Sequence, residues 1–177
     1  MVVKGPDNRV DEEFYRIVVT YEKELLRLCC VYLKDLSLAE DAVQETFVKA
    51  YRGWDAFRKE SSEKTWLVRI AINVCKDMRR NAWFRFIDRS VDMDRLEIAQ
   101  EEQNETASQL MSAIMRLPRA QMEVVLLYYY EGFNMRETGE MLGVSEMTVS
   151  RRLGKARSML KTWLERGWKG GVESEAR

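Results

Sequence analysis

The segment between Met135 and Leu153 limits most strongly what this chain can fold into. It predicts a helix, a tight turn at Gly143 and a second helix. Glycine in the turn suits a backbone with positive φ, and Gly139 provides a small residue where two helices would cross closely. Two short helices joined in this way form a helix-turn-helix, whose second helix lies in the major groove of DNA. The segment therefore predicts a helical C-terminal third with a nucleic-acid surface on it.

The second of these helices has two faces of different character. Apolar residues recur along one face at intervals of three and four, which predicts that this face packs inward; they are Val149, Leu153, Ala156, Leu160 and Trp163. Ser145 is a natural N-cap, and a helix N-terminus is also a good place to hold a phosphate. Arg151 suits a guanine edge, whereas Lys155 and Arg157 suit backbone phosphates. The residues expected to contact DNA are Ser145, Met147, Thr148, Ser150, Arg151, Arg152, Lys155 and Arg157.

A basic helix face can also be ordinary solvated surface. The two glycines and the apolar stripe are in register with it, and this favours the interpretation as a DNA-reading helix. The net charge of the chain is zero, but the charges are sorted along it. Residues 145–161 carry five basic groups against Glu146, whereas residues 85–107 carry three basic and seven acidic groups. Positive charge is therefore concentrated where DNA would bind.

The composition also argues against several classes of function. The chain has no histidine, which removes the commonest metal ligand and the commonest general base at neutral pH. Its three cysteines form no CxxC pair and are expected to be buried, reduced thiols. We therefore expect no metal site, no cofactor and no enzymatic activity. No segment is apolar over the length of a signal peptide or a membrane span, which predicts a cytoplasmic protein without membrane insertion.

Residues 1–84 contain three helical patterns, enough to bury a core of their own. The first spans Asp11 to Leu33. The second begins at Ser37, which lies three residues before Glu40 as in a capping box, and runs to about Trp54. The inward faces are predicted to hold Phe14, Ile17, Val18, Tyr21, Leu25, Leu28 and Tyr32 in the first helix and Ala39, Val43, Phe47, Ala50 and Trp54 in the second.

A polar loop, residues 58–64, precedes a third helix that is expected from about Thr65 to Asn81. This helix is predicted to bury Trp66, Ile70, Val74 and Met78. Its outer face mixes groups that read bases with groups that neutralise phosphates: Arg69, Asn73, Lys76, Asp77 and Arg80. Aromatic residues interleave with Arg85 just beyond, at Trp83, Phe84 and Phe86. That mixture is typical of surfaces that bind single-stranded nucleic acid, although such aromatic residues are more often part of a core.

The middle of the chain differs from both ends. Residues 85–107 are acidic and hold few apolar side chains, which predicts a flexible linker. A helix resumes from Ser108 to Leu117, and Pro118 is expected to start the next helix in its first turn, with Gly132 ending it. The predicted fold is therefore all-α. Two small helical domains, residues 1–84 and 108–177, are joined by the acidic linker, and the C-terminal domain holds the helix-turn-helix.

Four stretches of this chain together resemble the extracytoplasmic-function (ECF) sigma factors of bacterial RNA polymerase. They are AEDAVQETFVKAYRGW (39–54), TWLVRIAINVCKDMRR (65–80), LPRAQMEVVLLYYYEGFN (117–134) and VSEMTVSRRLGKARSML (144–160). They occur in the order and spacing of that family, and the resemblance extends over nearly all of the chain from Asp11 to Leu164. Thr138 and Gly139 depart from the pattern, because the family usually has an apolar residue and an alanine there.

The resemblance implies a role for each part. Residues 1–84 would form a region 2-like domain that binds the β′ clamp helices of the polymerase core through Asp41, Gln44, Glu45 and Val48. The same domain would recognise and melt the −10 element through Lys59, Ser61, Ser62, Lys64, Arg69, Asn73, Lys76, Asp77 and Arg80. Residues 108–177 would form a region 4-like domain that reads the −35 element, and the β flap of the core is a further implied partner. Promoter DNA and a cognate anti-sigma factor, which is often membrane-bound in this family, are the other implied partners.

Two other classes of function are alternatives to a sigma factor. A stand-alone helix-turn-helix regulator would bind a palindromic site as a dimer, and residues 1–84 would then serve as a ligand-binding or dimerisation domain. Such a domain needs no second nucleic-acid surface, so the polar loop and the basic third helix argue against it. A helical enzyme is disfavoured because the sequence shows no catalytic constellation.

Overall fold

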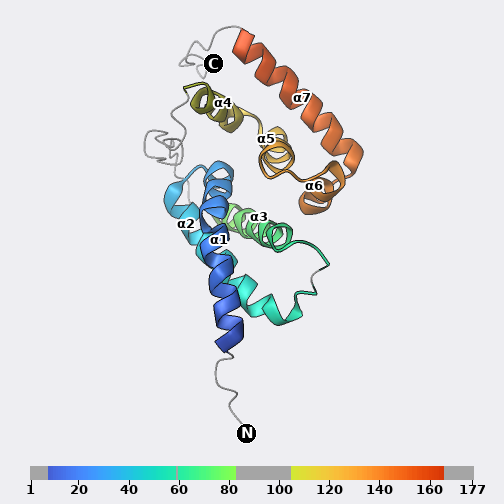
Figure 1. Ribbon diagram of the computed structural model, residues 1–177. Coiled ribbons are helices and arrows are strands. Elements are labelled where there is room, and N and C mark those ends of the chain that lie inside the picture. The colour runs from blue at the N-terminus through green and yellow to red at the C-terminus, as the bar shows by residue number, and fades with distance from the viewer. Residues whose placement is uncertain (1–7, 59, 83–104, 166–177) are drawn as a thin grey trace. The chain divides into compact units, whose positions relative to one another are not determined.

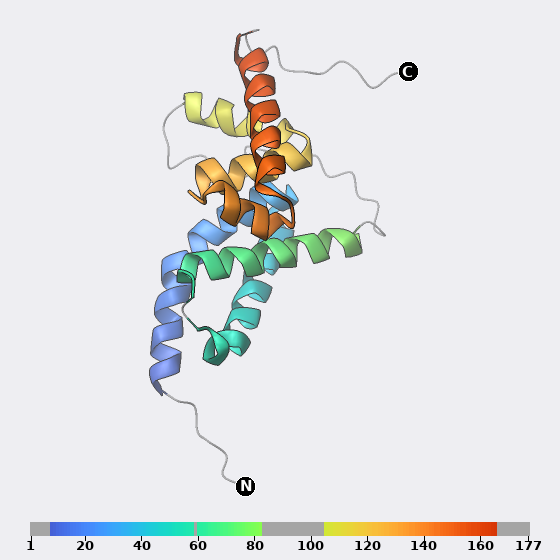
Figure 2. The same ribbon diagram turned by 90° about the vertical axis from the view of Figure 1, so that its right-hand side faces the viewer.

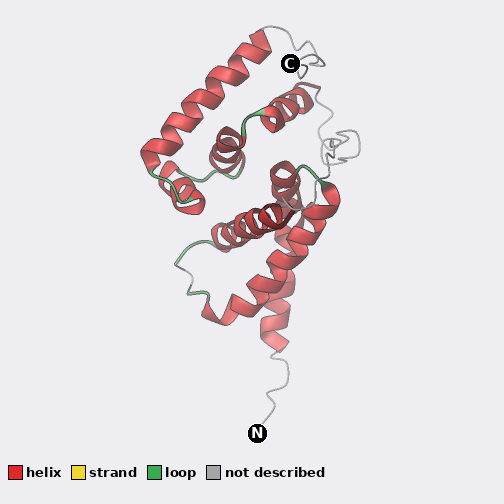
Figure 3. Cartoon of the chain, turned by 180° about the vertical axis from the view of Figure 1, so that it is seen from behind, coloured by secondary structure: helices red, strands yellow, loops and turns green. Residues whose placement is uncertain are grey.

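The structure is a computed structural model that describes residues 8–58, 60–82 and 105–165. Every regular element in these ranges is a helix, as Figure 3 shows, and this confirms the predicted all-α fold. The chain divides into two compact units, Met1–Ile98 and Ala99–Arg177. The acidic segment predicted as a linker lies mostly outside the described residues, and so do Trp83, Phe84, Arg85 and Phe86.

In the described part of the N-terminal unit there are three α-helices: α1 (Asn8–Leu33), α2 (Leu36–Gly53) and α3 (Glu63–Ala82). Each packs against the other two, as Figures 1 and 2 show in perpendicular views. A short 3₁₀ turn, Trp54–Ala56, follows α2. The predicted inward residues Phe14, Ile17, Leu25, Leu28 and Tyr32 of α1 are buried, whereas Val18 and Tyr21 are half-buried. The core therefore lies where the three helices meet.

The start of α2 differs from the prediction. Lys34 adopts a left-handed conformation with φ 57°, and Asp35 then forms the N-cap. The Asp35 carboxylate accepts a hydrogen bond from the Leu38 backbone N–H at 3.0 Å. The predicted capping box of Ser37 and Glu40 is wrong, because the helix already begins at Leu36 and Ser37 lies inside its first turn.

The buried face of α3 is also wider than predicted. The prediction named Trp66, Ile70, Val74 and Met78, but among these only Val74 is fully buried and the others are half-buried. The fully buried side chains of this helix are Leu67, Val68, Ala71, Ile72, Val74 and Cys75. Because α3 contacts both α1 and α2, two adjacent faces are covered rather than one stripe.

Six aromatic side chains gather at the end of α2: Phe14, Phe47, Tyr51, Trp54, Phe57 and Trp66. Trp54 lies at their centre, with its ring centroid 5.9 Å from those of Phe14 and Trp66 and 5.6 Å from that of Phe57. Aromatic rings at such separations attract each other in edge-to-face and offset-stacked arrangements, and they bury large apolar areas. This aromatic cluster ties α1, α2, the 3₁₀ turn with Phe57 after it, and the beginning of α3 together.

The C-terminal unit contains α4 (Glu105–Arg116), α5 (Arg119–Val125), α6 (Met135–Leu142) and α7 (Glu146–Glu165). A π-helical segment, Leu126–Tyr130, continues α5. The α7 helix packs against α5 and α6. Pro118 is the N-cap of α5 rather than its first helical residue, and its carbonyl accepts from the Met122 N–H at 3.0 Å. Gly132 follows the helical segment with φ 79°, which agrees with its predicted role at the end of the helix.

Candidate functional site

The turn between α6 and α7 depends on two glycines. Gly143 caps the C-terminus of α6 in the left-handed conformation, with φ 72° and ψ 37°. A Cβ atom on Gly139 would lie 2.7 Å from the backbone oxygen of Val144, closer than real Cβ atoms approach such a neighbour. The predictions for both positions are therefore confirmed. Gly139 lets the turn fold back against α6, and Gly143 provides the reversal that separates the two helices.

Both helices of the motif begin with side-chain caps. At α6, the Asn134 carboxamide oxygen accepts from the Glu137 N–H, and the Glu137 carboxylate accepts from the Asn134 N–H, both at 2.9 Å. This capping box escaped the sequence analysis, although an Asn three residues before a Glu is its signature. At α7, the Ser145 hydroxyl oxygen accepts from the Thr148 N–H at 3.3 Å, as predicted for an N-cap.

The two faces of α7 differ in burial. Val149, Leu153 and Ala156 are buried, whereas Leu160 and Trp163, predicted to face inward, are half-buried. Met147 is 81% exposed on the opposite face. The other residues predicted to contact DNA are exposed, except for the half-buried Thr148 and Arg152; the exposed ones are Ser145, Ser150, Arg151, Lys155 and Arg157. A row of basic and small polar groups is thus held on a rigid helix, with its apolar side anchored in the core.

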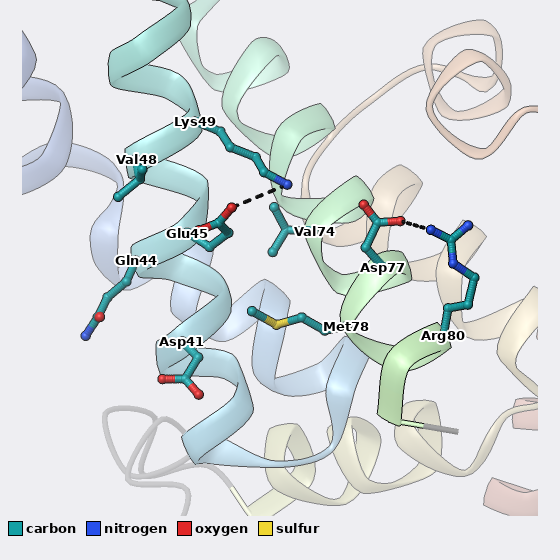
Figure 4. Close-up of a pocket in the computed structure, with 9 residues that line it drawn as sticks. All are labelled: Asp41, Gln44, Glu45, Val48, Lys49, Val74, Asp77, Met78 and Arg80. Atoms are coloured by element: carbon teal, nitrogen blue, oxygen red, sulfur yellow. Dashed lines mark hydrogen bonds and ion pairs between the residues drawn. The ribbon is translucent and has the colours of Figure 1, made fainter. Parts of the chain in front are cut away.

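A groove between α2 and α3 forms a second candidate site in the N-terminal unit, with a volume of about 620 Å³. The residues that line it come from both helices: Asp41, Gln44, Glu45, Val48 and Lys49 of α2, and Val74, Asp77, Met78 and Arg80 of α3. Figure 4 shows Glu45 and Lys49 extending toward α3, with their charged groups 3.5 Å apart. Asp77 and Arg80 form a second ion pair at 3.1 Å. The groove therefore has charged walls over an apolar patch made by Val74 and Met78.

The groove contains residues that the sequence analysis had assigned to two different partners. Asp41, Gln44, Glu45 and Val48 were expected to bind the polymerase core, whereas Asp77 and Arg80 were expected to contact the −10 element. The structure places both sets around one depression. Sequence spacing relates residues within one helix only, so it could not show that they converge.

The beginning of α3 is held to α1 by two ion pairs. Arg16 contacts Glu63 at 2.8 Å, and Lys64 contacts Glu24 at 2.6 Å. The hydrogen bond and the charge of Glu63 raise the pKa of Arg16 above its ordinary value. Lys64, which was expected to contact DNA, thus lies against a carboxylate of its own chain. The ion pairs position the polar loop relative to α1, a feature that local sequence patterns do not reveal.

The remaining residues expected to contact the −10 element lie in or after the polar loop. The Ser62 hydroxyl caps α3 by accepting from the Thr65 N–H at 3.0 Å. Ser61 is half-buried, and Lys59 lies outside the described residues. Along α3, Arg69, Asn73 and Arg80 are exposed and Lys76 is half-buried. Their spacing of three and four residues places them on one outward face of the helix.

The three cysteines agree with the prediction of buried, reduced thiols. Cys29, Cys30 and Cys75 are free and buried, and the sulfurs of Cys29 and Cys75 lie 3.6 Å apart. Burial raises the pKa of Cys30 to about 12, so this thiol stays protonated at neutral pH. In the part of the chain that the structure describes, three or more side chains that could hold a metal ion do not come together. Across the same residues, none of the helices combines the length and the apolarity needed to traverse a bilayer.

Comparison with known families matches two parts of the chain. Residues 17–85 match the model of sigma-70 region 2, and residues 113–162 match that of sigma-70 region 4. The ECF RNA polymerase sigma factor SigM of Mycobacterium tuberculosis is 33% identical over 159 residues, covering 89% of this chain and 78% of SigM. SigX of Bacillus subtilis, another ECF sigma factor, is 26% identical over 171 residues, covering 88% of this chain and 86% of SigX.

Solved structures show the same architecture. CnrH, solved in complex with the cytosolic domain of CnrY, aligns with a TM-score of 0.65 and 26% identity over 88% of this chain and 90% of CnrH. The sigma factor RpoE of Bartonella quintana, solved with the anti-sigma factor NepR, has the same fold, with a TM-score of 0.72 at 24% identity over 87% of this chain and 98% of RpoE. With both sigma-70 regions present in order and a relative of this similarity, the chain belongs to the ECF family of RNA polymerase sigma factors.

Proposed function

We propose that this sigma factor selects promoters through two surfaces that contact DNA and two that contact the core polymerase. The outer face of α7 reads the −35 element, and the outer face of α3 with the polar loop recognises and opens the −10 element. The groove between α2 and α3 binds the β′ clamp helices of the core, and the C-terminal unit meets the β flap. The basic outer face of α7, opposite its buried stripe, carries this proposal most directly.

The division of labour follows domain limits expected from the sequence, with residues 1–84 for core binding and the −10 element and residues 108–177 for the −35 element. The core supplies all the chemistry, so the chain itself is a specificity subunit and not an enzyme. Its place of action is the cytoplasm, where the core polymerase works. A near-zero net charge suits a factor that the polymerase delivers to DNA, because strong independent affinity for phosphates is then unnecessary.

A cognate anti-sigma factor is the remaining proposed partner. The solved relatives CnrH and RpoE were captured with CnrY and the anti-sigma factor NepR, respectively. By this likeness, a partner that covers the α2–α3 groove would compete directly with the core polymerase. The stand-alone dimeric regulator receives no support from the family matches.

Run-off transcription with bacterial core polymerase and a library of randomised promoters tests the proposal. Products that need this protein and share two short elements are expected. Arg151→Ala should reduce transcription roughly 5- to 100-fold, the range for one lost base contact, through the −35 element alone. Lys161→Ala, which removes a positive charge farther along the same helix, is the matched control and should change little.

The groove is tested separately by binding to the core without DNA. Asp41→Ala and Glu45→Ala should each weaken the holoenzyme complex, whereas Glu22→Ala removes an exposed acidic group of α1 outside the groove and should not. Transcription and core binding at the wild-type level in all three site variants would refute the assigned roles. A footprint on a palindrome by the protein alone, without core-dependent transcripts, would favour the dimeric regulator.

A further inference from the structure

Gly154 in the middle of α7 has no explanation within the described protein. Glycine destabilises a helix interior relative to alanine, since it loses more backbone entropy on folding. Gly139 shows what can justify such a residue, because a Cβ there would lie 2.7 Å from the Val144 backbone oxygen. A Cβ on Gly154 would meet none of the described residues within 4 Å, and its φ lies outside the range that favours glycine. Neither packing nor conformation requires glycine at this position.

The location of Gly154 on the helix suggests a reason outside the chain. It follows Met147 by seven residues, Ser150 by four and Arg151 by three, so it lies on the same face as all three. This face is turned away from the buried stripe of Val149, Leu153 and Ala156. Gly154 therefore lies in the middle of the surface assigned above to the −35 element, with exposed Lys155 and Ser158 beside it.

We propose that Gly154 is a specificity-determining residue, at which the α7 backbone contacts the edge of a T·A base pair and the thymine methyl group occupies the space of a missing side chain. The inference rests on the proposed role of α7. The major groove is about 12 Å wide and an α-helix with its side chains about 10–12 Å across, so a side chain on the contact face sets how deeply the helix enters. Thymine offers a C5-methyl group in that groove, a partner that suits a half-buried stretch of helix backbone that carries no side chain.

A second apolar group on this face of α7 is consistent with contacts to thymine methyl groups. Met147, 81% exposed one turn before Arg151, presents an apolar thioether on the same face as Gly154. Apolar contacts at Met147 and Gly154 would thus flank the charged contact of Arg151. The face is expected to read a methyl group on either side of a hydrogen-bonding base edge.

The experiment first selects a promoter for the wild-type holoenzyme from a library randomised in the −35 element. Each thymine of that element is then replaced by uracil, which removes the methyl group alone. One replacement should weaken binding of the wild-type holoenzyme roughly 5- to 100-fold, as for one lost base contact. The Gly154→Ala and Gly154→Gln variants should lose affinity in the order of side-chain size, and they should no longer distinguish uracil from thymine at that position.

Stability separates this role from a structural one. Gly154→Ala should raise the melting temperature while it lowers use of the promoter, because alanine is the better helix former. Thr162→Ala, at an exposed position two turns farther along α7, is the matched control; it should also favour the helix but leave promoter use unchanged.

Two outcomes would overturn the inference. One is that both Gly154 variants bind and transcribe the selected promoter like the wild type, with the same response to uracil. The other is that no thymine methyl group matters to the wild-type holoenzyme. Failure of the proposed function would look different, since the wild-type protein would then yield no promoter-dependent transcript from which to begin.

Discussion

The α3 helix of the N-terminal unit and the α7 helix of the C-terminal unit are both 20 residues long, yet different contacts hold them. Large side chains position α3: the aromatic cluster packs around Trp66 near its start, and the ion pairs to Arg16 and Glu24 tie its first turn to α1. Backbone geometry positions α7, because Gly139, Gly143 and the Ser145 cap fix the turn before it. The N-terminal unit should therefore be most sensitive to the loss of a large core side chain, and the C-terminal unit to the addition of a side chain in the turn.

Removing the centre of the aromatic cluster should produce the largest effect on stability. Trp54→Ala deletes a buried indole between three rings, and such substitutions cost about 3–5 kcal/mol. Urea unfolding monitored by hydrogen exchange should show the loss in α1, α2 and α3 while the C-terminal unit keeps its protection. Equal loss in both units would contradict the view that each has its own core.

Adding a side chain at Gly139 should destabilise the C-terminal unit. Gly139→Val places its side chain against the Val144 carbonyl, and the expected cost is about 3 kcal/mol because a backbone atom must move. The same substitution at Gly154, where a Cβ meets nothing, is the matched control and should barely change stability. Thermal unfolding of the two variants separates packing from helix propensity, and similar melting temperatures would refute the argument.

The buried thiol of Cys30 makes the N-terminal unit sensitive to alkali. Burial raises the pKa of Cys30 to about 12, above the value near 9.0 that an unfolded thiol has. The neutral thiol therefore contributes stability that is complete below pH 9 and is lost as the pH rises toward 12, by about 1.4 kcal/mol per pH unit. Cys30→Ala should flatten this decline in urea titrations between pH 9 and 11. If the free energy of unfolding of the variant declines with pH as steeply as that of the wild type, other groups cause the decline.

One buried threonine in each unit allows a comparison of small effects on stability. The Thr46 hydroxyl donates to the Ala42 carbonyl at 2.6 Å, whereas the Thr138 hydroxyl is buried without a hydrogen-bond partner among the residues that the structure describes. Thr138→Val keeps the shape and removes an unsatisfied polar group, so it should stabilise the protein by about 1 kcal/mol. Thr46→Val should destabilise it by a similar amount. Melting temperatures that move in the same direction for both would contradict the assignment.

The helix-turn-helix was the most predictable part of the molecule. The turn glycines, the Ser145 cap and the inward position of Val149, Leu153 and Ala156 all followed from local spacing. Such features depend on hydrogen bonds and faces within a few residues of chain, which sequence periodicity records directly. The Asn134–Glu137 capping box follows an equally local pattern, an Asn three residues before a Glu.

The predictions were weakest where contacts join distant residues. The fully buried face of α3 is wider than a single stripe because two helices cover it, and the N-cap of α2 falls at Asp35 because the chain reverses at Lys34. The pairing of Lys64 with Glu24 links residues 40 positions apart. Local patterns carry no information on such pairs.

The sequence by itself thus determined the helical fold, the family and most of the outward residues of α7, because each is encoded in short-range periodicity and motif spacing. Only the tertiary structure decided that Asp41, Glu45, Asp77 and Arg80 share one groove. It also showed that, of two helical glycines, Gly139 is required by packing and Gly154 is not. The physical reason is the same in both cases. The role of a side chain, or the need for a glycine in its place, depends on which atoms the folded chain brings within a few ångströms of that position.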